Sequence, residues 1–254
     1  MTVERVYGLH TVRALLTRAP QRVLRVYLQQ GRADQRATEI ESLAQAAGLG
    51  LERVDAKRLR GWVGDAAHQG VLAEVEALAP LSEDAFYAQL TAARDPLLLA
   101  LDGVQDPHNL GACLRTADAC GALAVIVPRD RAAQLTATVR KVAVGAAETT
   151  PVVAVTNLVR TLRLLKNAGL WVIGADAGAT QIAAEVDLRG PVVLVLGAEG
   201  SGVRHLTRQN CDFMVRLPQL GAVESLNVSV AAGMLLYEVV RQRTAQITDH
   251  PLVS

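Results

Sequence analysis

The chain is poor in several features, and each shortage excludes a class of protein. It has three Cys among 254 residues (Cys113, Cys120 and Cys211), and no two of them form a C-x-x-C pair. This usage argues against a disulfide framework or a zinc site and indicates reduced thiols in the cytoplasm. No stretch of about 18 apolar residues lacks a charge, so we expect no membrane span. The N-terminus carries spaced charges instead of a compact apolar block, so we expect no secretion signal.

Lysine is also scarce, because 23 of the 26 Lys and Arg residues are Arg. The formal net charge is only +1, so the total charge does not indicate a polyanionic partner. Residues 5–60, however, hold eleven Lys or Arg against five Asp or Glu. Arg presents a planar fork that suits phosphate, so this segment is a candidate RNA-binding surface. A codon bias toward Arg and an ordinary solvated face are the competing explanations.

Half of the residues are hydrophobic, which excludes a disordered chain and supplies a sizeable core. Residues 1–76 are predicted to form a small α/β domain, and residues 77–95 a linker containing a short helix. From residue 97, runs that are apolar throughout alternate with helical patterns, which predicts a parallel sheet covered by helices. The patterns predict helices over 6–18, 38–47 and 226–243, and strands over 23–28, 51–54, 70–75, 97–101, 123–127, 152–155, 170–173, 192–196 and 213–217.

Three segments that follow predicted strands carry residues suited to chemistry, at the edge where open α/β sheets bind ligands. In the first, residues 102–115, Asp106 and Pro107 form a turn, and His108 or Asn109 is expected to cap the next helix. Arg115 is expected to point toward solvent or the sheet edge. If Arg115 has only a structural role, we expect it to form an ion pair with Asp106 or Asp118.

The second segment, residues 194–203, runs from a buried strand into glycines spaced G-x-x-G-x-G, with Glu199 among them. The glycines allow either close approach of a ligand or a turn with positive φ, and Glu199 either orients a ligand or caps backbone amides. The third segment, residues 217–229, leads to a helix that Ser225 and Asn227 are placed to open. Both residue types are good N-caps, so a structural role competes with a catalytic one.

In this order, N-x5-R, LGAEGxG and LPxxxxxESLNVS, the three segments resemble the SpoU family of 2′-O-ribose RNA methyltransferases, part of the SPOUT class. Within it, the match is closest to the type that methylates a guanosine in large-subunit (23S) ribosomal RNA. Residues 7–16, the His68-Gln-Gly70 triplet and residues 136–149 also match, so the resemblance covers nearly the whole chain. Gln219 departs from it, because a Met is expected there.

The resemblance implies a small N-terminal RNA-binding α/β domain (1–76), a linker (77–95) and a SPOUT α/β domain (96–254) with a parallel sheet and a deep trefoil knot. It also implies S-adenosylmethionine as the cofactor, a homodimer formed through the C-terminal domain, and a cytoplasmic enzyme without a metal. The implied active-site residues are Asn109, Arg115, Glu199, Ser225 and Asn227, and the cofactor-binding residues are Leu196, Gly197, Gly200, Leu217, Leu226 and Asn227. The candidate RNA-binding residues are Arg5, Arg13, Arg18, Arg22 and Arg25.

Methyl transfer to a ribose 2′-hydroxyl needs an in-line nucleophile whose proton is removed or shared. The five His are scattered and no metal-ligand cluster is evident, so metal activation is not expected. Arg115 is either the base, as the family proposal has it, or a clamp on a neighbouring phosphate that stabilises charge on the 2′-oxygen. The alternatives are a SpoU enzyme acting on transfer RNA or an antibiotic-target ribosomal site, a non-catalytic RNA-binding assembly factor and, more remotely, a nicotinamide dehydrogenase.

Overall fold

The computed structural model describes residues 3–64, 68–76, 81–223 and 225–248, and these residues divide into two compact units. The first unit spans residues 1–79 and includes the short segment 144–149. The second unit spans residues 80–143 and 150–254. Each unit has its own sheet and its own hydrophobic core. Among the helices in the described ranges, none is long and apolar enough to span a bilayer.

The first unit is a four-stranded mixed sheet in the order β1-β4-β2-β3. One sheet face packs against α1 and α2 through alternate strand residues such as Val6, Ala73 and Val26. The opposite face packs in part against α3 through Tyr27 and Leu72. The elements are β1 (Val3–Tyr7), α1 (Leu9–Arg18), η1 (Pro20–Arg22), β2 (Val23–Gln29), α2 (Gln35–Ala46), β3 (Leu51–Val54), α3 (Ala56–Val63) and β4 (Val71–Glu76).

Two features of this unit differ from the sequence expectation. The helix predicted over 6–18 begins only at Leu9, because residues 3–7 pair with β4 as strand β1. Helix α3 was not predicted, because it is only eight residues long, contains Gly61 and buries only Leu59. Its N-cap is Asp55, whose side chain accepts a hydrogen bond from the Arg58 backbone N–H (2.7 Å).

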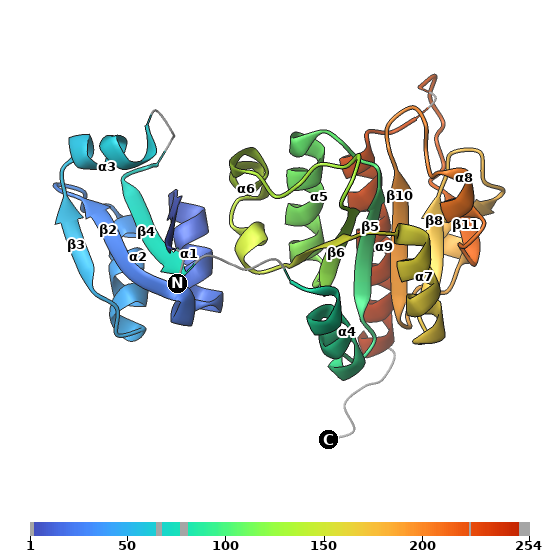
Figure 1. The fold of residues 1–254 in the computed structure, drawn as a ribbon, viewed down its shortest axis with the longest axis horizontal. Coiled ribbons are helices and arrows are strands. Elements are labelled where there is room, and N and C mark those ends of the chain that lie inside the picture. Colours follow the sequence, from blue (N-terminus) through green and yellow to red (C-terminus); the bar gives the residue numbers. More distant parts are fainter. Residues whose placement is uncertain (1–2, 65–67, 77–80, 224, 249–254) are drawn as a thin grey trace. The chain divides into compact units, whose positions relative to one another are not determined.

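The second unit is a seven-stranded parallel sheet in the order β7-β6-β5-β10-β8-β11-β9 (Figure 1). This confirms the predicted parallel sheet. Every residue of β5 and β6 is buried, because helices cover both faces. The strands are β5 (Leu97–Asp102), β6 (Ala124–Pro128), β7 (Val152–Val155), β8 (Trp171–Ala175), β9 (Gln181–Ile182), β10 (Val192–Gly197) and β11 (Phe213–Arg216).

Helices α4 and α7 contribute to the core on one sheet face, and α5 and α9 pack against each other and against strands on the other (Figure 1). Since all strands point the same way, their carboxyl ends meet at one edge, and the loops there build the site. The helical elements of this unit are α4 (Glu83–Ala92), α5 (Pro107–Ala119), α6 (Ala137–Ala143), α7 (Leu158–Asn167), η3 (Ala183–Glu185), α8 (His205–Arg208) and α9 (Val228–Thr248). The short helix η2 (Ala146–Glu148) lies in the segment that belongs to the first unit.

Helix α4 changes the interpretation of the predicted linker. It begins after Ser82, whose Oγ accepts a hydrogen bond from the Ala85 N–H (3.2 Å), as the sequence indicated. Its Phe86 and Leu90 side chains, however, are buried in the core of the second unit. Residues 83–92 therefore belong to that unit's packing, and residues 77–80 of the predicted linker lie outside the described residues.

We expect Phe86→Ala to lower the free energy of unfolding by about 3–5 kcal/mol, because it leaves a cavity under α4 in a fully buried position. Leu164→Ala, at a position that is 39% exposed, is the control and should cost well under half as much. Urea unfolding followed by circular dichroism measures both. Equal effects would show that α4 contributes no more to the second unit than a surface side chain does.

Candidate active site

The segments that follow β8, β10 and β11 enclose a cavity of about 430 Å³ at the carboxyl edge of the sheet, here called the inner cavity. Its wall combines apolar side chains, the backbone of the glycine turn and polar side chains. It contains five of the six residues predicted to bind the cofactor: Leu196, Gly197, Gly200, Leu217 and Leu226. The sixth, Asn227, hydrogen bonds to Glu199 in the same wall. The structure thus gathers these residues, and their role in binding stays a prediction.

The glycines after β10 are required by the turn itself. A Cβ on Gly197 would lie 1.8 Å from the Gly202 carbonyl carbon, so no side chain fits there. Gly200 and Gly202 have φ of +79° and +63°, which L side chains rarely adopt. The Gly202 N–H donates to the Ala198 carbonyl (2.9 Å) and closes the turn. The geometry of the turn is therefore sufficient to explain the three glycines. The same turn also lines the inner cavity.

Three predicted active-site residues, Asn109, Glu199 and Asn227, form one hydrogen-bonded group. The Asn109 Nδ2 donates to Glu199 Oε1 (3.2 Å), and the Asn227 Nδ2 donates to the same oxygen (2.6 Å) and to Asn109 Oδ1 (2.9 Å). The Val228 backbone N–H reaches Glu199 Oε1 at 3.4 Å. These bonds join α5, the glycine turn and the start of α9, which confirms that the three segments converge.

The structure shows which residues cap helices α5 and α9. Asp106 caps α5 by accepting from the His108 N–H (2.9 Å), so neither His108 nor Asn109 has that role. Asn109 is instead buried and turned toward Glu199. Asn227 caps α9, because its Oδ1 accepts from the Ser229 N–H (2.9 Å), and its Nδ2 belongs to the group above. Its catalytic role stays a prediction.

The two remaining predicted catalytic residues, Ser225 and Arg115, form no hydrogen bond with this group in the described part of the chain. Ser225 is exposed and lines the inner cavity. Arg115 is exposed on α5 and forms no hydrogen bond or ion pair with any residue in the described part of the chain, so it pairs with neither Asp106 nor Asp118. Arg115 lies six positions after Asn109 on α5. This spacing corresponds to about 9 Å along the helix axis and roughly 120° around it.

Gln219, the one departure from the family pattern, lies in the wall of the inner cavity. Its Oε1 is buried and has no hydrogen-bond partner among the residues that the structure describes. A buried acceptor without a partner is costly, and it suits a ligand that brings a donor. Asp176, in the same wall, is engaged with the protein, because it pairs with Arg208 (2.8 Å) and accepts from the Gly178 N–H (2.7 Å).

Two other kinds of chemistry would require a reactive thiol or a group of metal ligands. Burial raises the pKa of the Cys113 and Cys211 thiols to about 12, so both stay protonated and unreactive at neutral pH. Within the described ranges, no three or more His, Cys, Asp or Glu side chains are grouped as a metal site requires.

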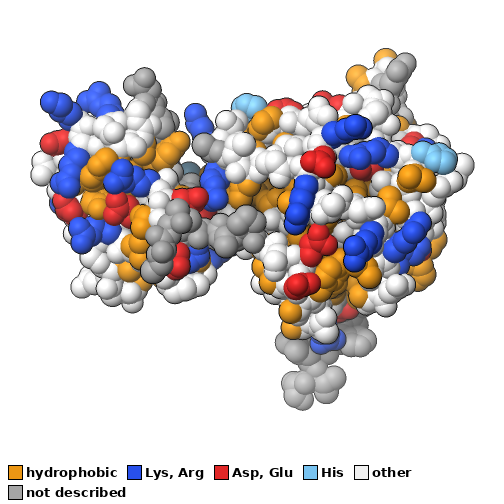
Figure 2. Space-filling view, in the orientation of Figure 1, with side chains coloured by type: hydrophobic (Ala, Val, Ile, Leu, Met, Phe, Trp, Pro, Cys, Tyr) orange, Lys and Arg blue, Asp and Glu red, His pale blue; other side chains and the backbone are white. Residues whose placement is uncertain are grey.

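The predicted RNA-binding arginines of the first unit do not form a single patch. Arg5 and Arg25 lie on one face of the sheet, whereas Arg13 and Arg18 lie on α1, which packs against the other face. Arg22 pairs with Glu148 (3.1 Å) and is 14% exposed, so its guanidinium is already used within the unit. On the face of this unit that Figure 2 shows, basic and acidic side chains are interspersed.

Around Arg5 lies a group that the sequence reasoning missed. Arg5 and Arg58 each approach the Trp62 ring, at 5.0 and 4.9 Å from its centroid. Arg5 also pairs with Glu74 (3.0 Å). Burial raises the pKa of Glu74, but hydrogen bonds from Arg5 and Tyr27 outweigh that and lower it overall. A lone Trp in an unpredicted helix gave no signal for this group.

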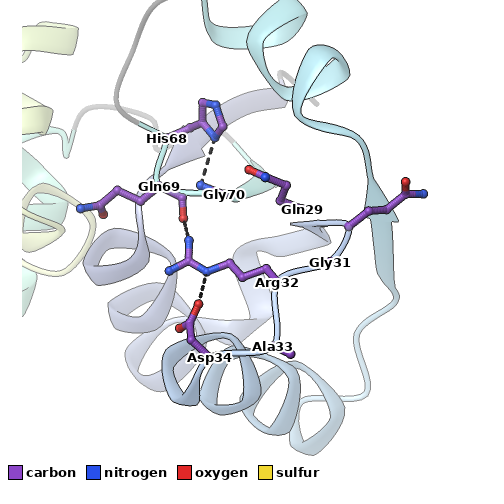
Figure 3. A pocket seen from close by; sticks show the side chains of 9 residues that line it. Gln29, Gly31, Arg32, Ala33, Asp34, His68, Gln69 and Gly70 are labelled. Carbon is purple, nitrogen blue, oxygen red and sulfur yellow. Dashed lines mark hydrogen bonds and ion pairs between the residues drawn. The ribbon is translucent and has the colours of Figure 1, made fainter.

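A second cavity, of about 700 Å³, lies in the first unit between residues 29–34 and the His68-Gln-Gly70 triplet (Figure 3). Arg32 links the two loops, because its guanidinium donates to the Gln69 carbonyl and pairs with Asp34 (2.6 Å). The His68 Nδ1 accepts from the Gly70 N–H (3.1 Å). The triplet thus braces these two loops.

Comparisons with known proteins agree with this geometry. A model of the SpoU rRNA methylase family matches residues 96–237, and a model described as RNA 2′-O ribose methyltransferase substrate binding matches residues 5–81. The 23S rRNA (guanosine-2′-O-)-methyltransferase RlmB of Pseudomonas aeruginosa is 53% identical over 242 residues, which cover 95% of this chain and 97% of that protein. This chain belongs to the SpoU family.

Other SpoU proteins extend the comparison. The protein of the same name from Haemophilus influenzae is 50% identical over 241 residues, or 94% of this chain and 98% of that one. Among solved structures, the SpoU methyltransferase AviRb from Streptomyces viridochromogenes, in complex with AdoMet, superposes with a TM-score of 0.75 at 23% identity. It covers 96% of this chain and 91% of that one, which shows a common fold.

We expect Asn227→Ala in this SpoU chain to lower the free energy of unfolding by about 2–3 kcal/mol, because it removes a helix cap and leaves the Oδ1 of the buried Asn109 without its donor. Asn157→Ala is the matched control. Asn157 caps α7 by accepting from the Arg160 N–H (3.0 Å), so its loss should cost about 1 kcal/mol. Urea unfolding measures both variants. Equal costs would mean that the group around Glu199 adds nothing to stability.

Proposed function

We propose that this chain transfers a methyl group from S-adenosylmethionine to the 2′-hydroxyl of a guanosine ribose in 23S ribosomal RNA. The observation that carries the proposal is the meeting of Asn109, Glu199 and Asn227 beside the inner cavity. The near full-length relatives are named as 23S rRNA (guanosine-2′-O-)-methyltransferases, which favours ribosomal over transfer RNA. The cytoplasm, where ribosomal RNA is available and thiols stay reduced, is the proposed location.

The residues of the inner cavity fit S-adenosylmethionine. A cavity of about 430 Å³ is within the size range of small-molecule sites. Leu196, Leu217 and Leu226 offer apolar walls to an adenine ring, and the glycine turn offers backbone groups. The unpartnered Gln219 Oε1 matches an amino-group donor such as that of adenine. The AviRb neighbour was solved with AdoMet bound. When bound, this sulfonium supplies an activated methyl group to a nucleophile in line with it.

The contribution of the chain is then to position the ribose and to stabilise charge. The group around Glu199 holds α5 and α9 against the glycine turn, so the ribose would meet a preformed surface. Ser225, exposed at the rim of the inner cavity, is placed to hydrogen bond to the reacting nucleotide. A guanidinium stays charged in proteins, so we assign Arg115 to clamping a phosphate next to the 2′-oxygen rather than to removing its proton.

We further propose a homodimer in which Arg115 serves the site of the partner subunit. Arg115 is exposed, lacks a described partner and lies on another side of α5 than Asn109. The neighbouring helix α9 exposes Val230, Met234 and Tyr237, a stripe at helical spacing that a second copy would cover. Contact between α5 and α9 places the arginine and the stripe on one helical layer.

Two more features of the family are proposed for this chain. The first is RNA binding by the first unit, supported by the match to a substrate-binding model and by Arg5 and Arg58 beside Trp62. Arg25 belongs to the same group, because it pairs with Glu52, as Arg58 does. The second is a trefoil knot in the second unit. It is supported by the order of the strands, because β10 follows β8 and β9 in the chain but lies between β5 and β8 in the sheet.

The purified protein, labelled S-adenosylmethionine and unmodified 23S ribosomal RNA test the function directly. We expect mass mapping of the RNA to find one 2′-O-methylguanosine, and calorimetry to detect binding of S-adenosylmethionine but not of NAD. We expect Arg115→Lys, which keeps the charge but loses the fork, to lower turnover roughly a hundredfold while cofactor affinity is unchanged. Near-normal turnover of that variant would rule out both roles considered for Arg115.

Light scattering tests the dimer. We expect the unaltered chain to be a dimer and Tyr237→Glu to shift it to a monomer, because a charge is then placed in the covered stripe; Tyr237→Phe is the control and should remain a dimer. Mixing Arg115→Lys with Asn109→Ala subunits then locates the arginine. With random exchange, mixed dimers should restore roughly a quarter of the activity if Arg115 acts across the interface. No recovery would place it in its own subunit's site.

A further inference from the structure

Two more cavities continue the inner cavity along the carboxyl edge of the parallel sheet. The middle cavity, about 460 Å³, lies at the ends of β5 and β10, and the outer cavity, about 520 Å³, lies beyond β6 and β7 at the start of α7. The inner and middle cavities share Glu199 and Val228 in their walls. The middle and outer cavities share Asp102, Arg131 and Arg204. The three therefore follow one another in the order of the strands.

Arg204 is held in place by a buried carboxylate. Asp102, at the end of β5, is only 1% exposed. Its Oδ1 lies 3.0 Å from the Arg204 Nε, and its Oδ2 accepts from the Arg204 backbone N–H (3.0 Å). The Arg204 side chain is half exposed, so the outer part of its guanidinium is left for a ligand. Such a pre-positioned fork loses little freedom when it binds a phosphate.

Arg131 is the second cation shared by these cavities, and it has no such partner. It is exposed and forms no hydrogen bond or ion pair with any residue within the described ranges. Its φ is +56°, a left-handed conformation that is uncommon for an arginine. Backbone held in this region is a reason to look for a function.

The loop that carries Arg131 is braced from within. The Gln134 Nε2 donates to the carbonyls of Pro128 (3.1 Å), Arg129 (3.2 Å) and Ala132 (3.2 Å). The Ala133 N–H donates to the Val104 carbonyl (2.8 Å), which ties the loop to the segment after β5. Neighbouring residues thus maintain the unusual backbone conformation of Arg131. Its side chain forms no hydrogen bond or ion pair with the described residues.

Acidic groups also face these cavities and narrow the choice of ligand. Asp106 and Glu199 line the middle cavity, and Asp130 lines the outer one. The charge of Asp102 is matched by Arg204. A free anion would be repelled by the unmatched carboxylates. A nucleotide satisfies both kinds of group, because its phosphate pairs with arginine while base N–H groups, such as those of guanine, donate to carboxylates.

We propose that the middle and outer cavities hold the RNA strand that flanks the target ribose, with Arg131 and Arg204 contacting a backbone phosphate. The N-terminus of α7, where Asn157 lines the outer cavity, adds a favourable dipole on the same path. This inference rests on the proposed function and adds to it the route of the substrate: from the inner cavity, over the ends of β5 and β6, toward β7.

Arg131→Gly tests the route, because it removes the guanidinium and suits the left-handed backbone. We expect its melting temperature to be unchanged or higher and its S-adenosylmethionine affinity by calorimetry to be unchanged. Its dissociation constant for unmodified 23S ribosomal RNA should rise roughly tenfold, and the slope of log affinity against log salt should fall by roughly 0.7 for one lost phosphate contact on a single strand. Arg131→Lys should keep the slope and recover part of the affinity.

Arg94→Ala is the matched control, since Arg94 is almost fully exposed and lines none of the three cavities. It should leave RNA affinity and salt slope unchanged. Arg131→Gln repeats the test with an uncharged side chain of similar shape, in case the glycine alters the loop. Wild-type affinity and slope in both variants would overturn the route while methylation by the unaltered chain still stands. Failure of the unaltered chain to methylate the RNA would instead remove the proposed function.

Discussion

One carboxylate oxygen joins the parts of this site. Glu199 Oε1 accepts hydrogen bonds from Asn109, from Asn227 and, at longer distance, from the Val228 backbone. The two asparagines are 90 and 28 residues away in the chain, one in the first turn of α5 and the other directly before α9. These bonds hold the glycine turn after β10 against the first turn of α5 and the start of α9. The glycine turn lines the inner cavity, so the same bonds fix one wall of that cavity.

Six of the seven strands of the second unit were predictable because of where they lie, whereas the two-residue β9 was missed. A strand covered on both faces is apolar at every position, so β5 and β10 appear as unbroken runs of Leu and Val. Helix α4 was interpreted as part of a linker, because its apolar residues do not follow a clear helical period and prolines flank it. Only the packing of Phe86 and Leu90 reveals its place. Strand β1 was hidden in the helix pattern that follows it, since Val6 fits both periods.

The site shows a different limit. The sequence marked Asn109, Glu199 and Asn227 one at a time, by residue type and by position after a strand. It offered no means to see that they bond to one another, because their separations exceed any local period. Arg22 is a second case in which a contact between distant residues could not be predicted from the sequence. It was grouped with exposed arginines, but Glu148, 126 residues later, takes up its charge. Charge counts along a sequence do not reveal such pairings.

The glycine turn after β10 sets unequal limits on mutational tolerance. At positions 200 and 202 the restriction is torsional, and asparagine, which enters the left-handed region more readily than most residues, is an acceptable replacement. At position 197 the restriction is a collision with the chain itself, so even alanine is excluded. Natural variants of this turn should drift at its second and third glycines, while the first stays invariant for reasons of space, independent of any ligand.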